Sequence, residues 1–350
     1  MESVPASSLS QQTSGHSGEG LELTVYFDPL RDGGRSSFYD ALEHEYVDRG
    51  LRISHRLRAA ESLGRSGRLR QDTDADVDPP LVVVAVDNGS DIRSALGGVS
   101  SQLGDALVTL AATEIVYAGA EALHRFGVEP AELAVHCRRG TGRDDPHGVG
   151  GVMEELRRHG IAGATALGRG QGTIAGRRHR PRTLSPTPLR DGPMMVVAID
   201  RADVFARAAP ALLALPQVEL VTAKPIALCK WRGHREPPPA PSADRPAWSK
   251  ITLYAAGDPL LGWRPEHLEV VKRLRKLGAP GATVLRAATG YALGDPLRPE
   301  RGWLGHRDAP TVTTIIDNPS HAARWLSAID DVTADNGLVT HEFVSAYHLM

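Results

Sequence analysis

A threefold internal repeat constrains the fold of this chain more than any other feature. The same order of strand and helix signals starts at three points, Glu22, Glu132 and Lys250. Each start reads as a short strand, and a helix-like spacing of apolar residues follows it. Each of these helices ends at a glycine that has the same separation from the start in every copy: Gly50, Gly160 and Gly278. Self-similarity at a fixed period indicates three copies of one structural unit.

The second half of each copy repeats as well. A second strand and a polar stretch rich in Gly, Arg and Pro lead to an apolar strand that begins with proline and ends with aspartate, at 80–87, 193–200 and 310–317. A second helix and a last strand close each unit. The order βαββαβ predicts a ferredoxin-like unit, with a four-stranded antiparallel sheet and both helices on one face. The expected fold class is therefore α+β.

The sheet face without helices is expected to be apolar and uncovered unless something packs on it. Segments 81–86 and 194–199 are apolar at both alternating sets of positions, which indicates burial on both faces. Three units that pack their open faces together would satisfy this requirement. We therefore expect one chain to form an intramolecular pseudo-trimer.

The domain organisation follows from the repeats. We expect a disordered tail, three repeats and two linkers, of which the second is proline-rich and semi-rigid. The boundaries are 1–20 for the tail, 21–119 for repeat 1, 120–131 for the first linker, 132–233 for repeat 2, 234–249 for the Pro-rich linker and 250–350 for repeat 3.

Composition narrows the class of protein but names no partner. Of the 350 residues 41% are hydrophobic and 23% charged, with a formal net charge of −2, which is typical of a globular protein and gives no reason to expect nucleic-acid binding. The first twenty residues have no apolar core and no basic start, and no stretch approaches the length of a membrane span. We expect a cytoplasmic protein in which Cys137 and Cys229 stay reduced.

Several local motifs give the chain a family resemblance. They are the ITLY start of repeat 3, the helices that end in leucine-glycine, Gly281 to Arg286 followed by Gly290 and Tyr291, the strand ending Ile-Ile-Asp317, and the closing 337–340. In these motifs the chain resembles the PII-like signalling proteins, and specifically their branch called domain of unknown function 190. Repeat 3 is the closest copy and repeat 1 the most eroded.

The resemblance implies a function. Proteins of that family are homotrimers that bind small effectors, usually adenine nucleotides, in the clefts between units, and a long loop between strands two and three then engages a transporter or enzyme. This chain would act as a monomeric pseudo-trimer with three unequal clefts. It would be a regulator and not an enzyme, would require no cofactor, and would have an adenine nucleotide as its effector.

The resemblance also places candidate ligand residues at the bases of these loops. Glycines there let phosphate oxygens approach backbone N–H groups. The predicted ligand residues are Gly168, Arg169, Gly170, Gln171 and Gly172 in repeat 2, Arg286, Gly290 and Tyr291 in repeat 3, and Arg58 in repeat 1. In repeat 1, Ser62 stands where a glycine is expected, which weakens that site.

The loop of repeat 2 is strongly basic. Its guanidinium groups could clamp a phosphate or dock on an acidic partner, or they could be a solvated face; the residues concerned are Arg177, Arg178, Arg180 and Arg182. Before the last strand, PII proteins carry a second phosphate loop, but here acidic residues such as Asp105, Glu219 and Asp335 stand in that region. They oppose binding of a triphosphate.

No catalytic or metal-binding motif is recognisable in the sequence. Asp87, Asp200 and Asp317 end the third strand of each copy, and we expect them to cap the following helix. Two alternatives to a regulator remain: a structural, partner-binding pseudo-trimer with decayed sites, and an acylphosphatase-like hydrolase. The hydrolase would need an arginine and an asparagine that the turns after the first strands do not clearly present.

Overall fold

The computed structural model describes most of the chain. The described residues are 19–27, 35–64, 69–71, 80–99, 106–140, 145–180, 191–241, 248–255, 260–261, 264–292, 298–299 and 309–348. The chain divides into two compact units: unit 1 holds 1–57, 81–224 and 346–350, and unit 2 holds 58–80 and 225–345. Repeat 2 lies in unit 1 up to Lys224, repeat 3 lies in unit 2 up to Ser345, and repeat 1 contributes to both.

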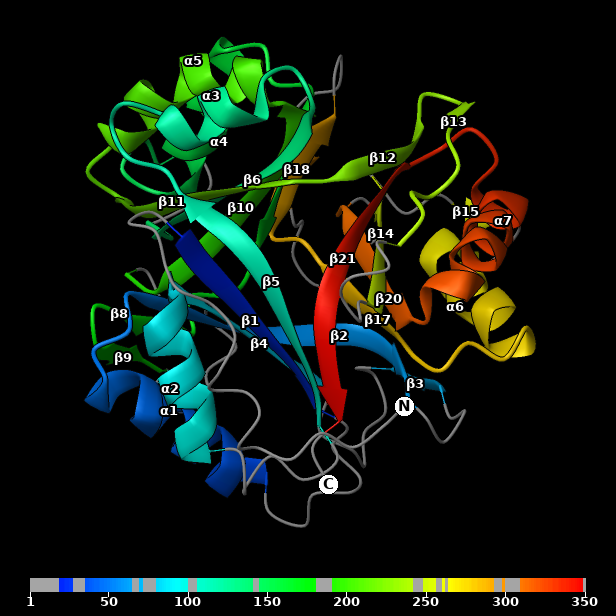
Figure 1. Cartoon of the computed structure of the whole chain (residues 1–350), viewed down its shortest axis with the longest axis horizontal. Coiled ribbons are helices and arrows are strands. Elements are labelled where there is room, and N and C mark those ends of the chain that lie inside the picture. Colours follow the sequence, from blue (N-terminus) through cyan, green and yellow to red (C-terminus); the bar gives the residue numbers. More distant parts are fainter. Residues whose placement is uncertain are drawn as a thin grey trace. The chain divides into compact units, whose positions relative to one another are not determined.

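Repeat 1 has the predicted order of elements, drawn in blue to cyan in Figure 1. Most of the expected N-terminal tail, residues 1–18, lies outside the described residues, and the first strand already begins at Glu19. The elements are β1 (Glu19–Phe27), α1 (Arg35–Asp48), β2 (Ile53–Leu63), β3 (Leu69–Gln71), β4 (Leu81–Asn88), α2 (Gly89–Val99) and β5 (Leu107–Ile115).

Repeat 2 follows the same order, with one addition. The segment 120–131, predicted to be a linker, contains the short helix α3 (Glu121–Phe126). The remaining elements are β6 (Pro130–Arg138), α4 (Val149–Arg158), β7 (Gly163–Leu167), β8 (Gly172–Ile174), β9 (Arg177–His179), β10 (Pro193–Arg201), α5 (Ala202–Leu213) and β11 (Val218–Pro225).

Repeat 3 follows a two-strand hairpin at the end of repeat 2. This hairpin consists of β12 (Ala227–Trp231) and β13 (His234–Arg235). The elements of repeat 3 are β14 (Trp248–Ala255), β15 (Leu260–Leu261), β16 (Arg264–Pro265), α6 (Glu266–Lys276), β17 (Ala282–Arg286), β18 (Thr289–Ala292), β19 (Arg298–Pro299), β20 (Thr311–Asp317), η4 (Pro319–His321), α7 (Ala322–Thr333) and β21 (Leu338–His348).

The main strands of the three repeats pair in the same order. In each repeat the first strand lies between the last strand and the proline-led third strand, and the third strand also pairs with the second. The orders are β5–β1–β4–β2, β11–β6–β10–β7 and β21–β14–β20–β17. The predicted α+β class and the threefold repetition are therefore confirmed.

Each unit buries an apolar core between its helices and sheet. In repeat 1, Tyr39, Leu42 and Tyr46 of α1 pack with Leu23 and Val25 of β1, as the helical spacing predicted. In unit 2, α6 and α7 cover one face of the repeat 3 sheet around Trp325 (Figure 1). Strands β4 and β10 are buried along almost their whole length, so the predicted burial of both their faces is confirmed.

The sheet face away from the helices differs in part from the prediction, because buried polar residues stand on it beside the apolar residues that were expected. Along β1, Leu23 and Val25 belong to the core, whereas Glu22 and Thr24 alternate with them and are also buried. The same alternation places Lys224 on β11, Thr252 on β14 and Thr340 on β21, each with an exposed fraction of 5% or less. This open face therefore carries buried charges and hydroxyl groups.

The recurring aspartates do not cap the following helices as predicted. Oδ2 of Asp87 accepts a hydrogen bond from N of Arg52 (2.7 Å), and Oδ2 of Asp200 accepts one from N of Ala162 (3.0 Å). Both amides precede the second strand of their repeats. In repeat 3 the equivalent residue is Pro280, which has no N–H.

Asp317, the equivalent aspartate of repeat 3, has other partners. Its Oδ2 accepts from Nε1 of Trp325 (2.8 Å) and contacts Nδ1 of His321 (2.9 Å). The aspartate thus fastens neighbouring elements in every repeat, by a backbone amide in two copies and by side chains in the third.

Neighbouring repeats are joined by shared strand pairing of two kinds, and each kind occurs twice at equivalent positions. In the first kind, an extension of the second strand adds to the second strand of another repeat: β8 pairs with β2 in unit 1, and the end of β2 pairs with β17 in unit 2. In the second kind, a last strand extends onto the next last strand: Ile115 lies opposite Thr222, and Leu228 lies opposite Thr340.

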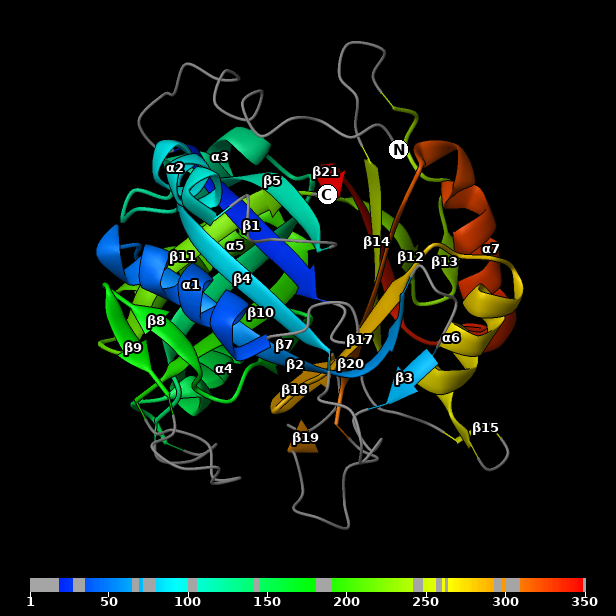
Figure 2. The same cartoon turned by 90° about the horizontal axis from the view of Figure 1, so that it is seen from below.

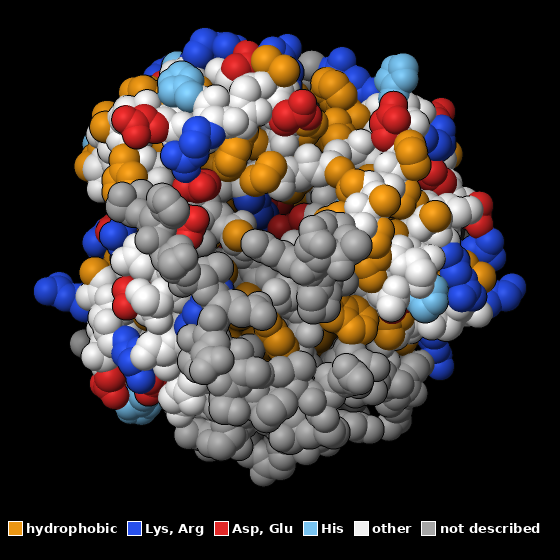
Figure 3. All heavy atoms as spheres, in the orientation of Figure 1, with side chains coloured by type: hydrophobic (Ala, Val, Ile, Leu, Met, Phe, Trp, Pro, Cys, Tyr) orange, Lys and Arg blue, Asp and Glu red, His pale blue; other side chains and the backbone are white. Residues whose placement is uncertain are grey.

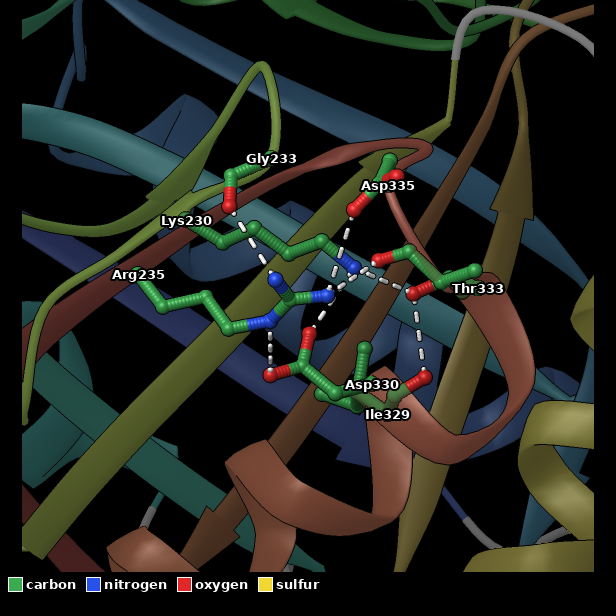
Figure 4. Close-up of polar contacts among 8 residues, drawn as sticks. Lys230, Gly233, Arg235, Ile329, Asp330, Thr333 and Asp335 are labelled. Atoms are coloured by element: carbon green, nitrogen blue, oxygen red, sulfur yellow. Dashed lines mark hydrogen bonds and ion pairs between the residues drawn. The ribbon is translucent and has the colours of Figure 1, made fainter.

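The hairpin β12–β13 is held to α7 by a polar cluster (Figure 4). The ammonium group of Lys230, only 2% exposed, lies 2.8 Å from Oδ1 of Asp330 and donates to Oγ1 of Thr333 (2.6 Å). Nε of Arg235 donates to the other oxygen of Asp330 (3.0 Å). One carboxylate at the end of α7 therefore holds two cations from the hairpin.

Cys137 and Cys229 are free and buried, as expected, and burial raises their pKa values to about 12 and about 11.

Among the described helices, none combines the length and apolar character that a membrane span requires.

Candidate functional site

The predicted loop base of repeat 2 lies directly on repeat 1. Gly168, Gly170 and Gly172 have φ values of 106°, 78° and 141°, which glycine adopts readily and other residues do not. The N–H of Arg56 in β2 donates to the carbonyl of Gln171 (2.9 Å). A Cβ atom at Gly172 would clash with the carbonyl of Ser54, so glycine is needed for the two backbones to approach.

The two ends of this loop meet at a second close approach. A Cβ atom at Gly192 would collide with the carbonyl of Gly170, and the carbonyl of Gly192 accepts a hydrogen bond from N of Arg139 (3.0 Å). The loop between β8 and β10 therefore leaves from a fixed base. Its residues 181–190, which include the predicted contact Arg182, lie outside the described residues.

The basic residues at the start of this loop contact repeat 1. The β8–β9 hairpin lies beside α1 (Figure 2). Arg180 forms ion pairs with Glu43 and Asp40, and Nε of Arg178 lies 3.8 Å from Oε2 of Glu43. Arg177 of β9 is exposed. Two of the predicted clamp residues are thus bound to carboxylates of the same chain, and a role toward phosphate stays a prediction for all of them.

Glu43 is the centre of this contact. Its carboxylate is 1% exposed and accepts a hydrogen bond from the hydroxyl of Tyr39 (3.2 Å). Burial, and then the nearby Glu43 charge, raise the pKa of Tyr39. Both Arg56 and Arg180 stack on the Tyr39 ring, at 4.3 and 5.2 Å from its centroid. Because a buried carboxylate needs a cation, Arg180 is an integral part of this packing.

Repeat 1 has no glycine turn at the position predicted for its loop base. Residues 58–63 continue β2 and pair with β17 of repeat 3 in unit 2, so Arg58 is an exposed residue of a strand and not of a loop. Ser62 lies opposite Thr283, where a side chain fits between paired strands. A β-bulge at this junction lets Glu61 and Ala59 face consecutive residues of β17.

In unit 2 this junction brings together an acid, an imidazole and a guanidinium group. Oε2 of Glu61 lies 2.9 Å from Nε2 of His267 on α6, and both side chains are at most 3% exposed. Arg286, a predicted ligand residue, lies 3.6 Å from the other oxygen of Glu61. The predicted Gly290 and Tyr291 belong to β18 and are buried. Sequence reasoning missed Glu61 and His267 because they come from different repeats.

The acidic residues before the last strands are largely engaged. Glu219 forms an ion pair with Arg138 (2.6 Å), and the amide of Gln217 donates to the carbonyls of Pro146 (3.0 Å) and Gly148 (3.3 Å). Asp335 contacts Arg235, and Asp105 lies outside the described residues. This region is therefore built from internal hydrogen bonds and ion pairs.

The described segments contain no group of three or more His, Cys, Asp or Glu side chains placed to hold a metal ion. On the face shown in Figure 3, acidic and basic side chains are interspersed among the described residues. This mixture fits the small net charge of the chain.

The sequence profile of DUF190, described as "Uncharacterized ACR", matches three stretches: 20–115, 142–228 and 248–346. The chain belongs to the DUF190 family. These matches coincide with the three repeats, so the predicted resemblance to this family is confirmed in three copies.

A protein similar to this chain has about the length of one repeat. A UPF0166 protein of Aquifex aeolicus (strain VF5) is 28% identical over 99 residues, which are 28% of this chain and 92% of that protein. The relative therefore corresponds to about one repeat.

Proposed function

We propose that this DUF190 protein is a PII-like, non-enzymatic regulator that binds a small effector, an adenine nucleotide, at junctions between its repeats. The observation that carries the proposal is the loop base of repeat 2, where Gly168, Gly170 and Gly172 lie against β2 of repeat 1. Such a glycine-rich turn between two repeats can offer backbone N–H groups to phosphate oxygens. Arg169 and Gln171 stand in the same turn.

The proposal includes three ferredoxin-like repeats that form an intramolecular pseudo-trimer. It is supported by the two kinds of strand pairing between repeats, which recur at equivalent positions in both units. A relative of about one repeat in length also supports it, because single repeats would need to associate where this chain has them fused. Closure into a ring of three is part of the proposal.

The proposed sites are unequal. The turn of repeat 2 has three glycines with positive φ, whereas the corresponding part of repeat 1 is a continuous strand. In repeat 3, Arg286 is already close to Glu61. We therefore place the strongest effector site at the turn of repeat 2. In this proposal the loop that leaves this turn controls a transporter or an enzyme, and no cofactor is required.

Isothermal titration calorimetry of the full chain with ATP, ADP, AMP and cyclic AMP tests the proposal. We expect binding by at least one nucleotide and about a tenfold or greater loss in Arg169→Ala, because a charged hydrogen bond to phosphate is removed. Arg207→Ala, on the exposed side of α5, is the matched control and should bind as the wild type does. If no nucleotide gives heat or protects the protein from thermal unfolding, the proposal fails.

A second candidate is a structural, partner-binding pseudo-trimer without an effector. The observation that favours it is the ion pairing of Arg178 and Arg180 with Glu43 and Asp40, which uses charges that a phosphate would need. The two candidates differ in one measurement: once a partner is known, its affinity changes with nucleotide only in the first. An acylphosphatase-like activity has no support in the described residues.

A further inference from the structure

The two junctions at which an extended second strand meets another repeat have the same register but differ in one side chain. In unit 1, where β8 pairs with β2, the carbonyl of Gln171 accepts a hydrogen bond from N of Arg56 (2.9 Å). In unit 2, Glu61 lies opposite Val284 of β17. Arg56 and Val284 have the same separation from the starts of their repeats. Gln171 and Glu61 therefore occupy equivalent places, and one of them is neutral whereas the other is acidic.

The carboxylate of Glu61 is shared between two side chains of repeat 3. Its Oε2 lies 2.9 Å from Nε2 of His267 on α6, and its Oε1 lies 3.6 Å from a guanidinium nitrogen of Arg286 on β17. The acid belongs to repeat 1, whereas the imidazole and the guanidinium group belong to repeat 3. The three groups therefore come together where the two repeats are paired.

These three side chains differ in their access to solvent. Glu61 and His267 are 3% and 1% exposed, whereas Arg286 is 29% exposed. Because a buried carboxylate is strongly destabilising without a counter-charge, Glu61 depends on its partners in repeat 3. Arg286 forms the side of the group that faces solvent.

A guanidinium group and an imidazole on either side of a carboxylate are contacts that also bind free oxyanions. We propose that unit 2 contains an anion-binding site, formed by Arg286 and His267, which the chain fills with its own Glu61. The ligand class that fits this site is a small oxyanion, because a side-chain carboxylate already makes these contacts. With Glu61 in place, the site is closed to free anions.

The internal ligand also gives a reason for the difference between the two junctions. At the position equivalent to Glu61, Gln171 carries no charge and its amide can donate hydrogen bonds to an anion. A carboxylate at this position instead repels an anion and competes with it for Arg286. The proposal goes beyond effector binding, because it concerns the other junction and is tested with a different ligand.

The test removes the internal ligand from the full chain and adds a free one. Glu61→Ala deletes a group of the size of acetate and should lower the melting temperature by about 10 °C, since His267 and Arg286 lose their carboxylate. Acetate should then refill the site. With a Kd of about 10 mM, acetate at about 0.1 M should raise the melting temperature by about 4 °C over the same concentration of chloride.

Three further variants show where the acetate binds. Glu61→Gln fills the same space with a neutral amide, so it should be destabilised but should not respond to acetate. Glu61→Ala with Arg286→Ala keeps the space and removes the guanidinium group, so its response should be less than half that of Glu61→Ala. Glu154→Ala, which removes an exposed carboxylate on α4, is the control and should melt as the wild type does in both salts.

Two results would overturn the proposal. One is an acetate effect on Glu61→Ala no larger than that of chloride. The other is an undiminished acetate effect in the variant that also lacks Arg286, because the anion would then bind elsewhere. If Glu61→Ala does not stay folded, its refolding yield from urea is compared in the two salts: a higher yield in acetate supports the proposal and equal yields overturn it. Nucleotide titration uses the wild type, so failure of the effector proposal remains a separate result.

Discussion

His55 of repeat 1 and His136 of repeat 2 stack on each other in unit 1, with Nε2 of His55 2.8 Å from Nδ1 of His136. Both rings are at most 1% exposed. Burial lowers the pKa of His136 from 6.5 to about 3. Burial, followed by the adjacent imidazole, also lowers the pKa of His55 well below its usual value, against the opposing effects of a hydrogen bond to the backbone of Pro193 and of the nearby Glu22 charge. The folded protein thus holds two neutral imidazoles in contact.

This pair predicts that the protein loses stability in mild acid. Below pH 6.5 the unfolded chain binds protons that the folded chain excludes. The contribution of the two histidines to the free energy of unfolding is therefore at its full value above that pH and falls as the pH drops toward about 3. Each histidine should remove up to about 1.4 kcal/mol per pH unit in this window. Urea unfolding at pH 7.5, 6 and 5 measures the slope.

The matched variant for this prediction is His55→Thr, because threonine stands at the equivalent positions of the other repeats, Thr165 and Thr283. In this variant the free energy of unfolding should fall less steeply as the pH drops, because about one proton fewer is taken up on unfolding. An unchanged slope would mean that the acid sensitivity arises elsewhere.

The fastening role of Asp87 gives a second prediction. Asp87→Ala leaves the N–H groups of Arg52 and Asn88 without their carboxylate acceptor. We expect the free energy of unfolding to fall by about 1–3 kcal/mol, since two partly buried donors would lose their acceptor. Glu154→Ala, at an exposed position of α4, is the control, and denaturant midpoints compare the two. Equal midpoints would show that the aspartate contributes nothing.

The repeat frame could be predicted from the sequence because its signals are local. Apolar spacing along α1, the glycine that ends each first helix and the proline-led strands all reflect preferences of short segments. These signals recur three times, so an ambiguous copy such as repeat 1 could be aligned on the clearer repeat 3. Element order and the two-faced burial of β4 and β10 followed from the same observations.

The junctions between repeats could not be predicted in the same way, because they depend on pairing between distant segments. Nothing near residues 58–63 shows that they continue β2 to meet β17, since the partner lies in another repeat. The close contact of Glu61 and His267, and the docking of Arg180 on Glu43, have the same origin. Strand pairing and ion pairing are tertiary effects that override local preference.

Unlike the junctions between repeats, the polar residues of the open sheet face are indicated by the sequence itself. Glu22 and Thr24 alternate with Leu23 and Val25, which indicates that the polar residues face away from the helices. Such alternation is usually interpreted as a solvent-exposed face. The residues are nevertheless buried, because ion pairs such as that of Lys224 with Glu132 satisfy their charges.

Two glycines in different surroundings, Gly192 at the loop base of repeat 2 and Gly97 in α2 of repeat 1, should respond in opposite ways to substitution by alanine. Gly192→Ala should destabilise the fold or displace the loop, because the added methyl group would collide with the backbone of Gly170. Gly97→Ala, at an exposed position of α2 with open space around it, should stabilise the helix by up to about 1 kcal/mol. Thermal unfolding of both variants tests this contrast, which would be refuted by a neutral Gly192→Ala.

The cluster at the end of α7 predicts that its two central residues respond unequally to substitution. Asp330→Ala leaves the ammonium of Lys230 buried with the hydroxyl of Thr333 as its remaining contact in the cluster, and should lower the free energy of unfolding by about 3–5 kcal/mol. Lys230→Met keeps the apolar stem and leaves Asp330 bound to Arg235 (3.0 Å), so the loss should be about 1 kcal/mol.

Arg235→Ala is the control for this pair of variants. The Arg235 side chain is 46% exposed, and its removal leaves Asp330 paired with Lys230 (2.8 Å), so the change should stay below about 1 kcal/mol. Urea unfolding of the three variants gives the ranking directly. If Lys230→Met is as damaging as Asp330→Ala, the prediction is wrong, because only the carboxylate variant leaves a buried cation without its counter-charge.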